Sequence, residues 1–195
     1  MADPVLWERL RAKSNDDLIS RAEVRIVEEG IYEIDVLNEK HQLDSNRQII
    51  LRSGQIISQE MDDHCSTALI SYLLECKSID PAGEWVSPTE LASGAQFFRG
   101  PHGVPVNKIT ARFGNDKTRF EEVCKRLGGE PVEYADAAYS FSVFKRIPVA
   151  VLLWLEDDEF PARVSILVDR NAHLHFQLDA LLGVFMIIEE ALLRS

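Results

Sequence analysis

Apolar and polar residues alternate with a period of two in the first part of the chain. In GIYEIDVLNEKHQL, the apolar residues Tyr32, Ile34 and Val36 are separated by acidic residues, which is the pattern of a strand with one buried face. The segment NEK predicts a turn, and RQIILRSGQIIS predicts two more short strands about Ser53–Gly54. We therefore expect an antiparallel meander here.

A second block of strands is predicted in the last third. AYSFSVF and PARVSILVD alternate, whereas IPVAVLLWLED between them is almost continuously apolar. The short EDDEF link predicts that the last two of these strands form an antiparallel hairpin.

Helical periodicity predicts the remaining elements. The stripe from Cys65 to Cys76 has the spacing of a buried helix face, with Asp62 or Asp63 as its cap, and we expect this helix to pack across the meander. Other helices are expected from their caps and periodicity: one opening at Asp3–Pro4, one at Asn15–Asp16, one near Asn107–Phe113, and one from Asn115 to Leu127 that stops at Gly128–Gly129.

The C-terminal stretch LDALLGVFMIIEEALL predicts a helix that is apolar almost all round. Such a helix must be buried on several sides, by its own sheet or by a partner subunit, so a homodimer through this helix is one expectation. Strands and helices come in blocks, which predicts the α+β class, with antiparallel strand blocks covered by helices. We expect a single domain over residues 1–195, or two lobes at about 1–93 and 94–195 that share one core.

The formal net charge of −11 argues against general nucleic-acid binding, because phosphate backbones would be repelled. The N-terminus lacks the apolar core of a signal peptide, and the most apolar stretch is shorter than the roughly 20 residues of a membrane span. We therefore expect a cytoplasmic protein without a membrane partner. The three cysteines fall on apolar stripes, so structural thiols are predicted.

Phosphate-loop, dinucleotide-fold, serine-hydrolase and zinc-protease motifs are absent from the sequence. His173 and His175 in HLH could chelate a metal from one face of a strand with Asp169 nearby, but polar residues between a strand and a helix usually face water. No metal site is therefore predicted. The acidic run Glu156–Glu159 is interpreted as a solvated hairpin tip, because it lacks the spaced ligands of a calcium loop.

The central segment from Ser78 to Pro105 is rich in glycine and proline, which excludes long regular elements. Within it, GAQFFRGPHGVP holds the strongest candidate site. Arg99 offers a charged fork for a carboxylate or phosphate, and His102 can carry a proton or act as a ligand. The alternative is structural: Phe97 and Phe98 anchor the loop, while Arg99 pairs with a surface acid and His102 caps a turn.

Several segments resemble an uncharacterised bacterial and archaeal family, catalogued as domain of unknown function 3786. The similar segments are ISYLL, GEWVS, FFRGPH followed by RFG, LGG, AD at Ala135–Asp136, and FPARVSILVDRNA. They run in order over most of the chain from Ile70 onward, and none is a catalytic signature. The chain departs from the pattern at Gly103 and around HLHFQLD. The resemblance implies an intracellular protein of largely anaerobic microbes, with no assigned reaction or cofactor.

Three functions are compatible with these features. The first is a binding or accessory protein for an anionic small molecule or cofactor in anaerobic metabolism, with Phe97, Phe98 and Trp85 lining a pocket between the strand blocks. There Arg99 would hold the anion, and His102 would form a hydrogen bond or act as a ligand. The second is an enzyme with His102 as general acid/base, supported by Asp136 or Asp169. The third is a partner-binding subunit without a pocket.

Overall fold

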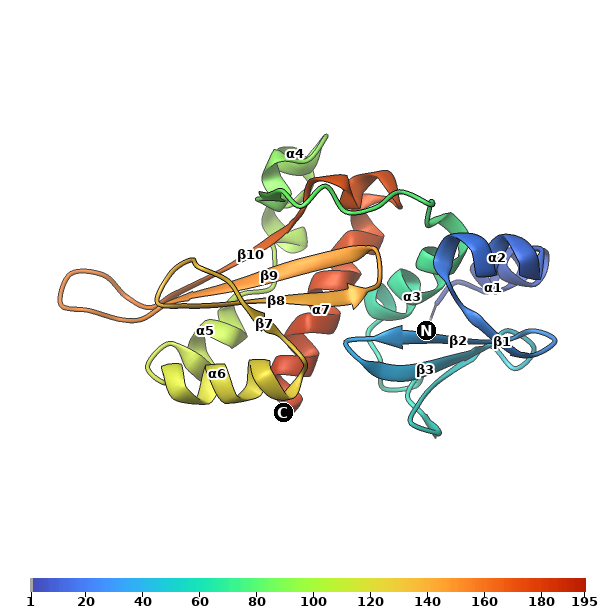
Figure 1. Ribbon diagram of the computed structural model, residues 1–195, viewed down its shortest axis with the longest axis horizontal. Coiled ribbons are helices and arrows are strands. Elements are labelled where there is room, and N and C mark those ends of the chain that lie inside the picture. Colours follow the sequence, from blue (N-terminus) through green and yellow to red (C-terminus); the bar gives the residue numbers. More distant parts are fainter. Residues whose placement is uncertain (1) are drawn as a thin grey trace.

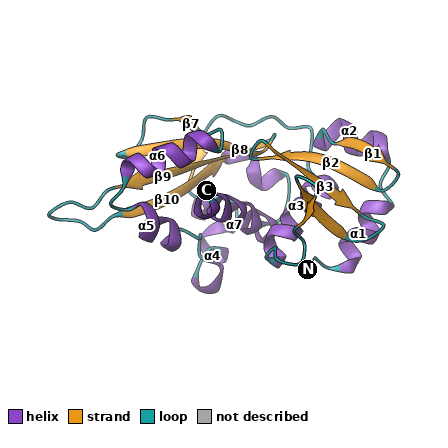
Figure 2. Ribbon diagram, turned by 90° about the horizontal axis from the view of Figure 1, so that it is seen from below, coloured by secondary structure: helices purple, strands orange, loops and turns teal. Residues whose placement is uncertain are grey.

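The computed structural model describes residues 2–195, which form seven α-helices and two five-stranded antiparallel sheets (Figure 1). The α+β class predicted from the sequence is confirmed. The first sheet and the second sheet lie at opposite ends of the molecule, and helices α3 (Asp63–Glu75) and α7 (Leu178–Arg194) run between them (Figures 1 and 2).

The first sheet is the predicted meander, in which consecutive strands pair in the order β1-β2-β3-β4-β5. Its strands are β1 (Arg25–Glu28), β2 (Ile31–Val36), β3 (Glu39–Asp44), β4 (Ile49–Arg52) and β5 (Gln55–Ile56). The β2–β3 turn is made by Leu37 and Asn38, both with positive φ. The amide of Leu37 donates to the carbonyl of Val143 at 3.2 Å, which joins the first sheet to the second.

The second sheet has the order β6-β10-β9-β8-β7. Its strands are β6 (Trp85–Val86), β7 (Glu130–Pro131), β8 (Ala137–Phe144), β9 (Ile147–Trp154) and β10 (Arg163–Asp169). Strands β9 and β10 form the predicted hairpin. Strand β6 comes from the central segment and pairs with β10, so residues before position 94 complete the second sheet.

Helix α3 begins as predicted at Asp62, whose carboxylate accepts from the amide of His64 at 2.8 Å. It packs most extensively against α7. It also reaches the second sheet, because the Tyr72 ring stacks on Phe144 with 4.3 Å between ring centroids. In α7, the side chains of Phe185 and Ile188 are fully buried within the chain. A dimer through α7 would therefore have to use other side chains of that helix.

Four shorter helices cover the remaining surfaces: α1 (Pro4–Arg11), α2 (Asn15–Ala22), α5 (Asn107–Phe113) and α6 (Lys117–Arg126). The Asp3 side chain caps α1 and Asp116 caps α6, each through a backbone amide. The central segment contains only short elements: β6, the 3₁₀ helices η1 (Pro88–Glu90) and η2 (Gly100–His102), and α4 (Gly94–Phe97). This agrees with its glycine and proline content. One apolar cluster runs through both sheets and the helices between them.

Candidate functional site

The loop from Gly94 to Pro105 is anchored by its two phenylalanines. Phe98 is buried and packs against Phe185 of α7, with 5.7 Å between ring centroids. Phe97 is half-buried, meets Phe98 edge to face, and stacks on the imidazole of His102 at 4.9 Å. The aromatic residues therefore fix the loop to the core and orient His102 over Phe97.

Arg99 and His102 are exposed, and no ion pair or carboxylate hydrogen bond engages either side chain within residues 2–195. The two acids proposed to support His102 are used elsewhere. Asp169 accepts from the amides of Ala82 and Gly83 at 2.9 and 2.8 Å, and Asp136 accepts from Leu155. Their carboxylates therefore organise backbone in other parts of the fold.

Trp85 lies on the face of the second sheet that points away from α7. It belongs to a small separate apolar cluster around Ala150 and Leu152, whereas its neighbour Val86 faces the main core. Phe98 packs on α7, on the opposite side of the sheet. The structure therefore brings Phe97 and Phe98 together but places Trp85 away from them, on the other face of the second sheet.

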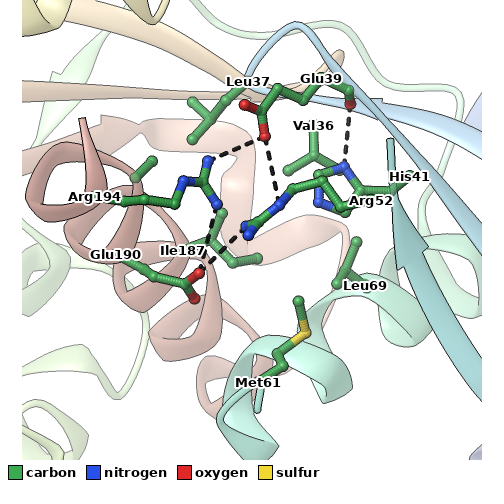
Figure 3. A pocket seen from close by; sticks show the side chains of 11 residues that line it. Val36, Leu37, Glu39, His41, Arg52, Met61, Leu69, Ile187, Glu190 and Arg194 are labelled. Carbon is green, nitrogen blue, oxygen red and sulfur yellow. Dashed lines mark hydrogen bonds and ion pairs between the residues drawn. The ribbon is translucent and has the colours of Figure 1, made fainter. Parts of the chain in front are cut away.

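An ion-pair cluster closes a small cavity between the first sheet and α7 (Figure 3). Glu39 lies 3.1 Å from Arg194 and 3.8 Å from Arg52, and Glu190 lies 3.3 Å from Arg52. The cavity beneath has a volume of about 20 Å³, which is room for about one water molecule. We interpret this cluster as a clamp between β3, β4 and the end of α7, and not as a ligand site.

A larger hollow, of about 420 Å³, lies at the start of α7. Its wall comes from the end of α3, the residues before α4, the 3₁₀ helix η3 (Arg170–Leu174) and the first residues of α7. The lining residues are Glu75, Lys77, Ala92, Ser93, His173, Leu174, His175, Phe176, Gln177 and Leu178. We call it the α7 hollow. Its wall therefore includes both histidines of the HLH motif and Ser93, the residue immediately before the Gly94–Pro105 loop.

His175 is the most buried polar residue of the α7 hollow, with 1% of its surface exposed. The amide of Lys77 donates to Nδ1 of His175 at 3.3 Å. The same Nδ1 atom lies 3.6 Å from Sγ of Cys76. Burial, together with the charges of Arg146 and Lys77, lowers the pKa of His175, so the ring is neutral near pH 7. Since Nδ1 accepts, the ring proton is on Nε2, and this buried N–H has no partner among residues 2–195.

The other polar side chains of the α7 hollow are partly or fully exposed. The His173 Nδ1–H donates to the carbonyl of Arg170 at 2.8 Å, so Nε2 of the neutral ring is an acceptor and becomes a donor only when the ring is protonated. Lys77 is exposed and has no ion pair with any described residue. Helix α7 begins without a side-chain cap at Gln177, although Asp179 accepts from the next amide, that of Ala180. The uncapped start of a helix favours negative charge.

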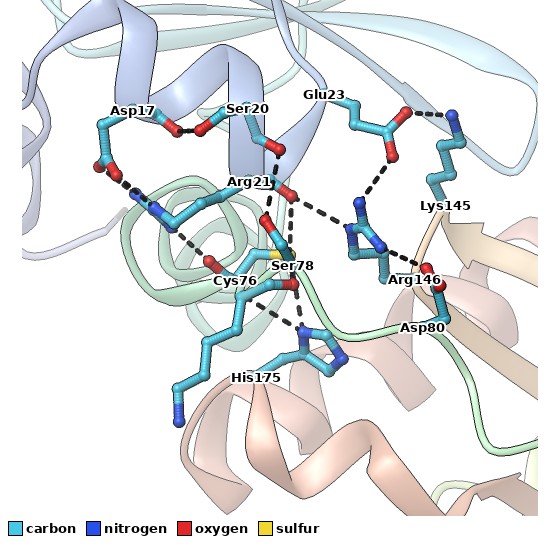
Figure 4. A network of polar contacts seen from close by, with 11 residues as sticks. Asp17, Ser20, Arg21, Glu23, Cys76, Ser78, Asp80, Lys145, Arg146 and His175 are labelled. Atoms are coloured by element: carbon cyan, nitrogen blue, oxygen red, sulfur yellow. Dashed lines mark hydrogen bonds and ion pairs between the residues drawn. The ribbon is translucent and has the colours of Figure 1, made fainter.

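A network of polar contacts holds the Cys76 side of the α7 hollow in place (Figure 4). Arg21 of α2 pairs with Asp17 and donates to the carbonyl of Cys76. Arg146, in the turn between β8 and β9, donates to Asp80 at 2.7 Å and to Glu23 at 2.9 Å. Two arginines thus tie α2, the end of α3 and the second sheet together beside His175.

The histidines of HLH do not lie on a strand. His173 lies in η3 and His175 immediately follows it, so they do not share a strand face. No group of three or more His, Cys, Asp or Glu side chains within residues 2–195 is arranged to hold a metal ion. None of the helices in this range is long and apolar enough to cross a membrane.

The model of a domain of unknown function, DUF3786, matches the chain over residues 15–190. The chain belongs to the DUF3786 family. The resemblance seen in the sequence is therefore confirmed, and the matched region includes the Gly94–Pro105 loop and all residues of the α7 hollow. Neither a curated protein nor a solved structure matches the chain significantly.

Proposed function

We propose that this DUF3786 protein is a binding or accessory protein for an anionic small molecule, and that the molecule binds in the α7 hollow. The observation that carries the proposal is the exposed ammonium group of Lys77 on the wall of the hollow, which has no ion pair with any described residue. The Nε2–H of His175 has no acceptor among residues 2–195, but this atom is covered and lies behind the surface that a ligand would contact. A carboxylate or phosphate oxygen is the group that the exposed ammonium favours.

Further features of the wall support an anionic ligand. His173 supplies an imidazole that can donate from Nε2 when it is protonated, and Ser93 and Gln177 supply neutral polar side chains. The first turn of α7 contributes the positive end of a helix of 17 residues. Glu75 opposes an anion, but its carboxylate is partly neutralised by Arg9 at 3.3 Å.

The proposed site lies beside the loop that the sequence singled out. Ser93 lines the α7 hollow and immediately precedes α4. Arg99 and His102 form a matched control for Lys77 and His173, because each pair combines one cation with one histidine. Substituting one pair or the other shows whether a ligand binds at the start of α7 or at the loop.

The experiment is isothermal titration of the protein with inorganic phosphate, a phosphate monoester and a dicarboxylate. The double variant Lys77→Ala/His173→Ala is compared with Arg99→Ala/His102→Ala. We expect the first variant to lose at least about ten-fold in affinity, or 1.4 kcal/mol, and the second to bind like the wild type. The opposite result would move the site to the Gly94–Pro105 loop, and failure of all three anions to bind would reject an anion-binding function.

A further inference from the structure

A second hollow, of about 580 Å³, lies at the outer end of the second sheet. It is formed by the start of β8, the end of β9 and the β9–β10 connection, and its lining residues are Asp136, Trp154, Leu155, Asp157, Phe160, Pro161, Ala162 and Arg163. Figure 1 shows this connection extending past the rest of the molecule, at the end opposite the first sheet. We call this surface, together with Tyr134, the distal surface.

The tip of the β9–β10 connection is held by its own hydrogen bonds. The Asp157 carboxylate accepts from the amides of Glu159 and Phe160 at 2.8 and 2.7 Å, and the Asp157 amide donates to the Phe160 carbonyl. Asp136 ties the opposite wall by accepting from the amide of Leu155 at 2.8 Å. The hollow is therefore preformed, which lowers the entropic cost of binding.

Large apolar side chains are exposed on the distal surface. Phe160 is 66% exposed and Tyr134 is 48% exposed. Trp154 is half-buried, and the guanidinium of Arg163 lies 4.1 Å from its ring centroid. Asp136 also lines the adjoining hollow that contains Tyr134, so the two aromatic patches are continuous. Exposed aromatic residues around a hollow are typical of surfaces that anchor a partner.

The charge around these aromatic residues is strongly negative. Segments 133–136 and 155–163 together contain six carboxylates and one guanidinium, a net charge of −5. The carboxylates belong to Glu133, Asp136, Glu156, Asp157, Asp158 and Glu159, and no Lys or Arg among the described residues forms an ion pair with any of them. The complementary partner must therefore supply positive charge.

We propose that the distal surface docks a basic segment of a partner protein, with an apolar or aromatic side chain of that segment inserted beside Phe160 and Trp154. Lysines and arginines flanking this anchor pair with the carboxylates of the rim. A phosphate backbone or an anionic lipid would be repelled by the same carboxylates. The distal surface shares no residue with the α7 hollow, so the two proposals stand or fall separately.

The probe is a pool of fluorescent peptides of about 12 residues, composed of Lys, Arg and Ala around one Trp or Phe. A second pool replaces Lys and Arg with Glu. We expect the basic pool to bind in the micromolar range at low salt, to weaken as salt is added, and to bind at least ten-fold more tightly than the acidic pool.

Two variants locate the binding. Phe160→Ala and Asp158→Asn/Glu159→Gln are each expected to weaken the basic pool at least ten-fold. The matched control Ile56→Ala removes an exposed apolar side chain from β5, and Glu28→Gln/Glu29→Gln removes two exposed carboxylates from the end of β1 and the turn after it. Both controls should bind like the wild type. The proposal would be overturned if the controls lost as much affinity as the two variants, or if both peptide pools bound equally well. It would also be overturned if the protein bound anionic vesicles or an oligonucleotide in place of the peptides, or if no peptide bound up to about 1 mM.

Discussion

The Sγ atom of Cys76 lies 3.6 Å from Nδ1 of His175. The two residues are 99 positions apart in the chain, and their contact joins the end of α3 to the segment that precedes α7. The amide of Lys77 donates to the same Nδ1 atom at 3.3 Å. These contacts fix the tautomer of His175 and place its ring on the wall of the α7 hollow.

The stability of the protein is expected to fall as the pH drops below about 6.5, and His175 contributes to this fall. Its pKa is lowered in the folded state by burial and nearby cations, so the unfolded chain takes up the proton first. The contribution is therefore fully present above the ordinary pKa of 6.5 and is lost as the pH falls from there toward the lower pKa of the folded state. The slope from one such group is at most about 1.4 kcal/mol per pH unit.

Urea unfolding of the wild type and of His175→Gln between pH 7 and pH 5 measures this contribution. Glutamine retains an acceptor for the Lys77 amide but does not titrate, so the variant should lose less stability on acidification. Part of the dependence should remain, because burial also lowers the pKa of His41. Parallel curves for the two proteins would show that His175 does not titrate in this way.

The three thiols are expected to resist modification by thiol reagents in the folded protein. All three cysteines are buried and free, and burial raises the pKa of each, that of Cys65 to about 12. The thiolate is the reactive form, so a disulfide reagent at pH 8 should label them only as fast as the chain unfolds. Rapid labelling of one thiol in the native protein would contradict this prediction, because it would show that solvent reaches that thiol without unfolding. Cys76 is the cysteine that lies beside the α7 hollow.

Gly183 sets the distance between α3 and α7. A Cβ atom at this position would lie 2.1 Å from the carbonyl oxygen of His64 and 2.8 Å from Cβ of Ala68. Gly183→Ala should therefore force the two helices apart and lower the free energy of unfolding by about 1–3 kcal/mol. Urea denaturation compares it with Gln96→Ala, an exposed position in α4. An unchanged midpoint for Gly183→Ala would contradict the close packing.

Elements with a strong local signal could be predicted from the sequence. The Cys65–Cys76 stripe and Asp62 defined α3, and the β9–β10 hairpin was defined by a continuously apolar run before EDDEF and an alternating run after it. Strand β6 could not be predicted, since it has two residues and depends on pairing with β10, more than 75 positions later. Its pairing places Trp85 on the outer face of the second sheet, away from Phe98.

The sequence does not predict the α7 hollow, because its residues come from three separate segments of the chain. Each has an ordinary local explanation: Lys77 follows a helix, Ser93 precedes one, and His175 lies in a turn. One local signal was present, since α7 begins after HLH without a Ser, Thr, Asp or Asn at its N-cap position. The Phe97–Phe98 pair, in contrast, has the structural role of anchoring the loop to the core.

The most direct test of anion binding at the start of α7 is a titration of ¹⁵N-labelled protein with inorganic phosphate, followed by amide chemical shifts. We predict saturable shifts centred on the amides of Lys77, Leu178 and Asp179, and their loss in Lys77→Ala/His173→Ala. Shifts centred on Phe97–Gly103, or no saturable shift at any phosphate concentration reached, would contradict this site.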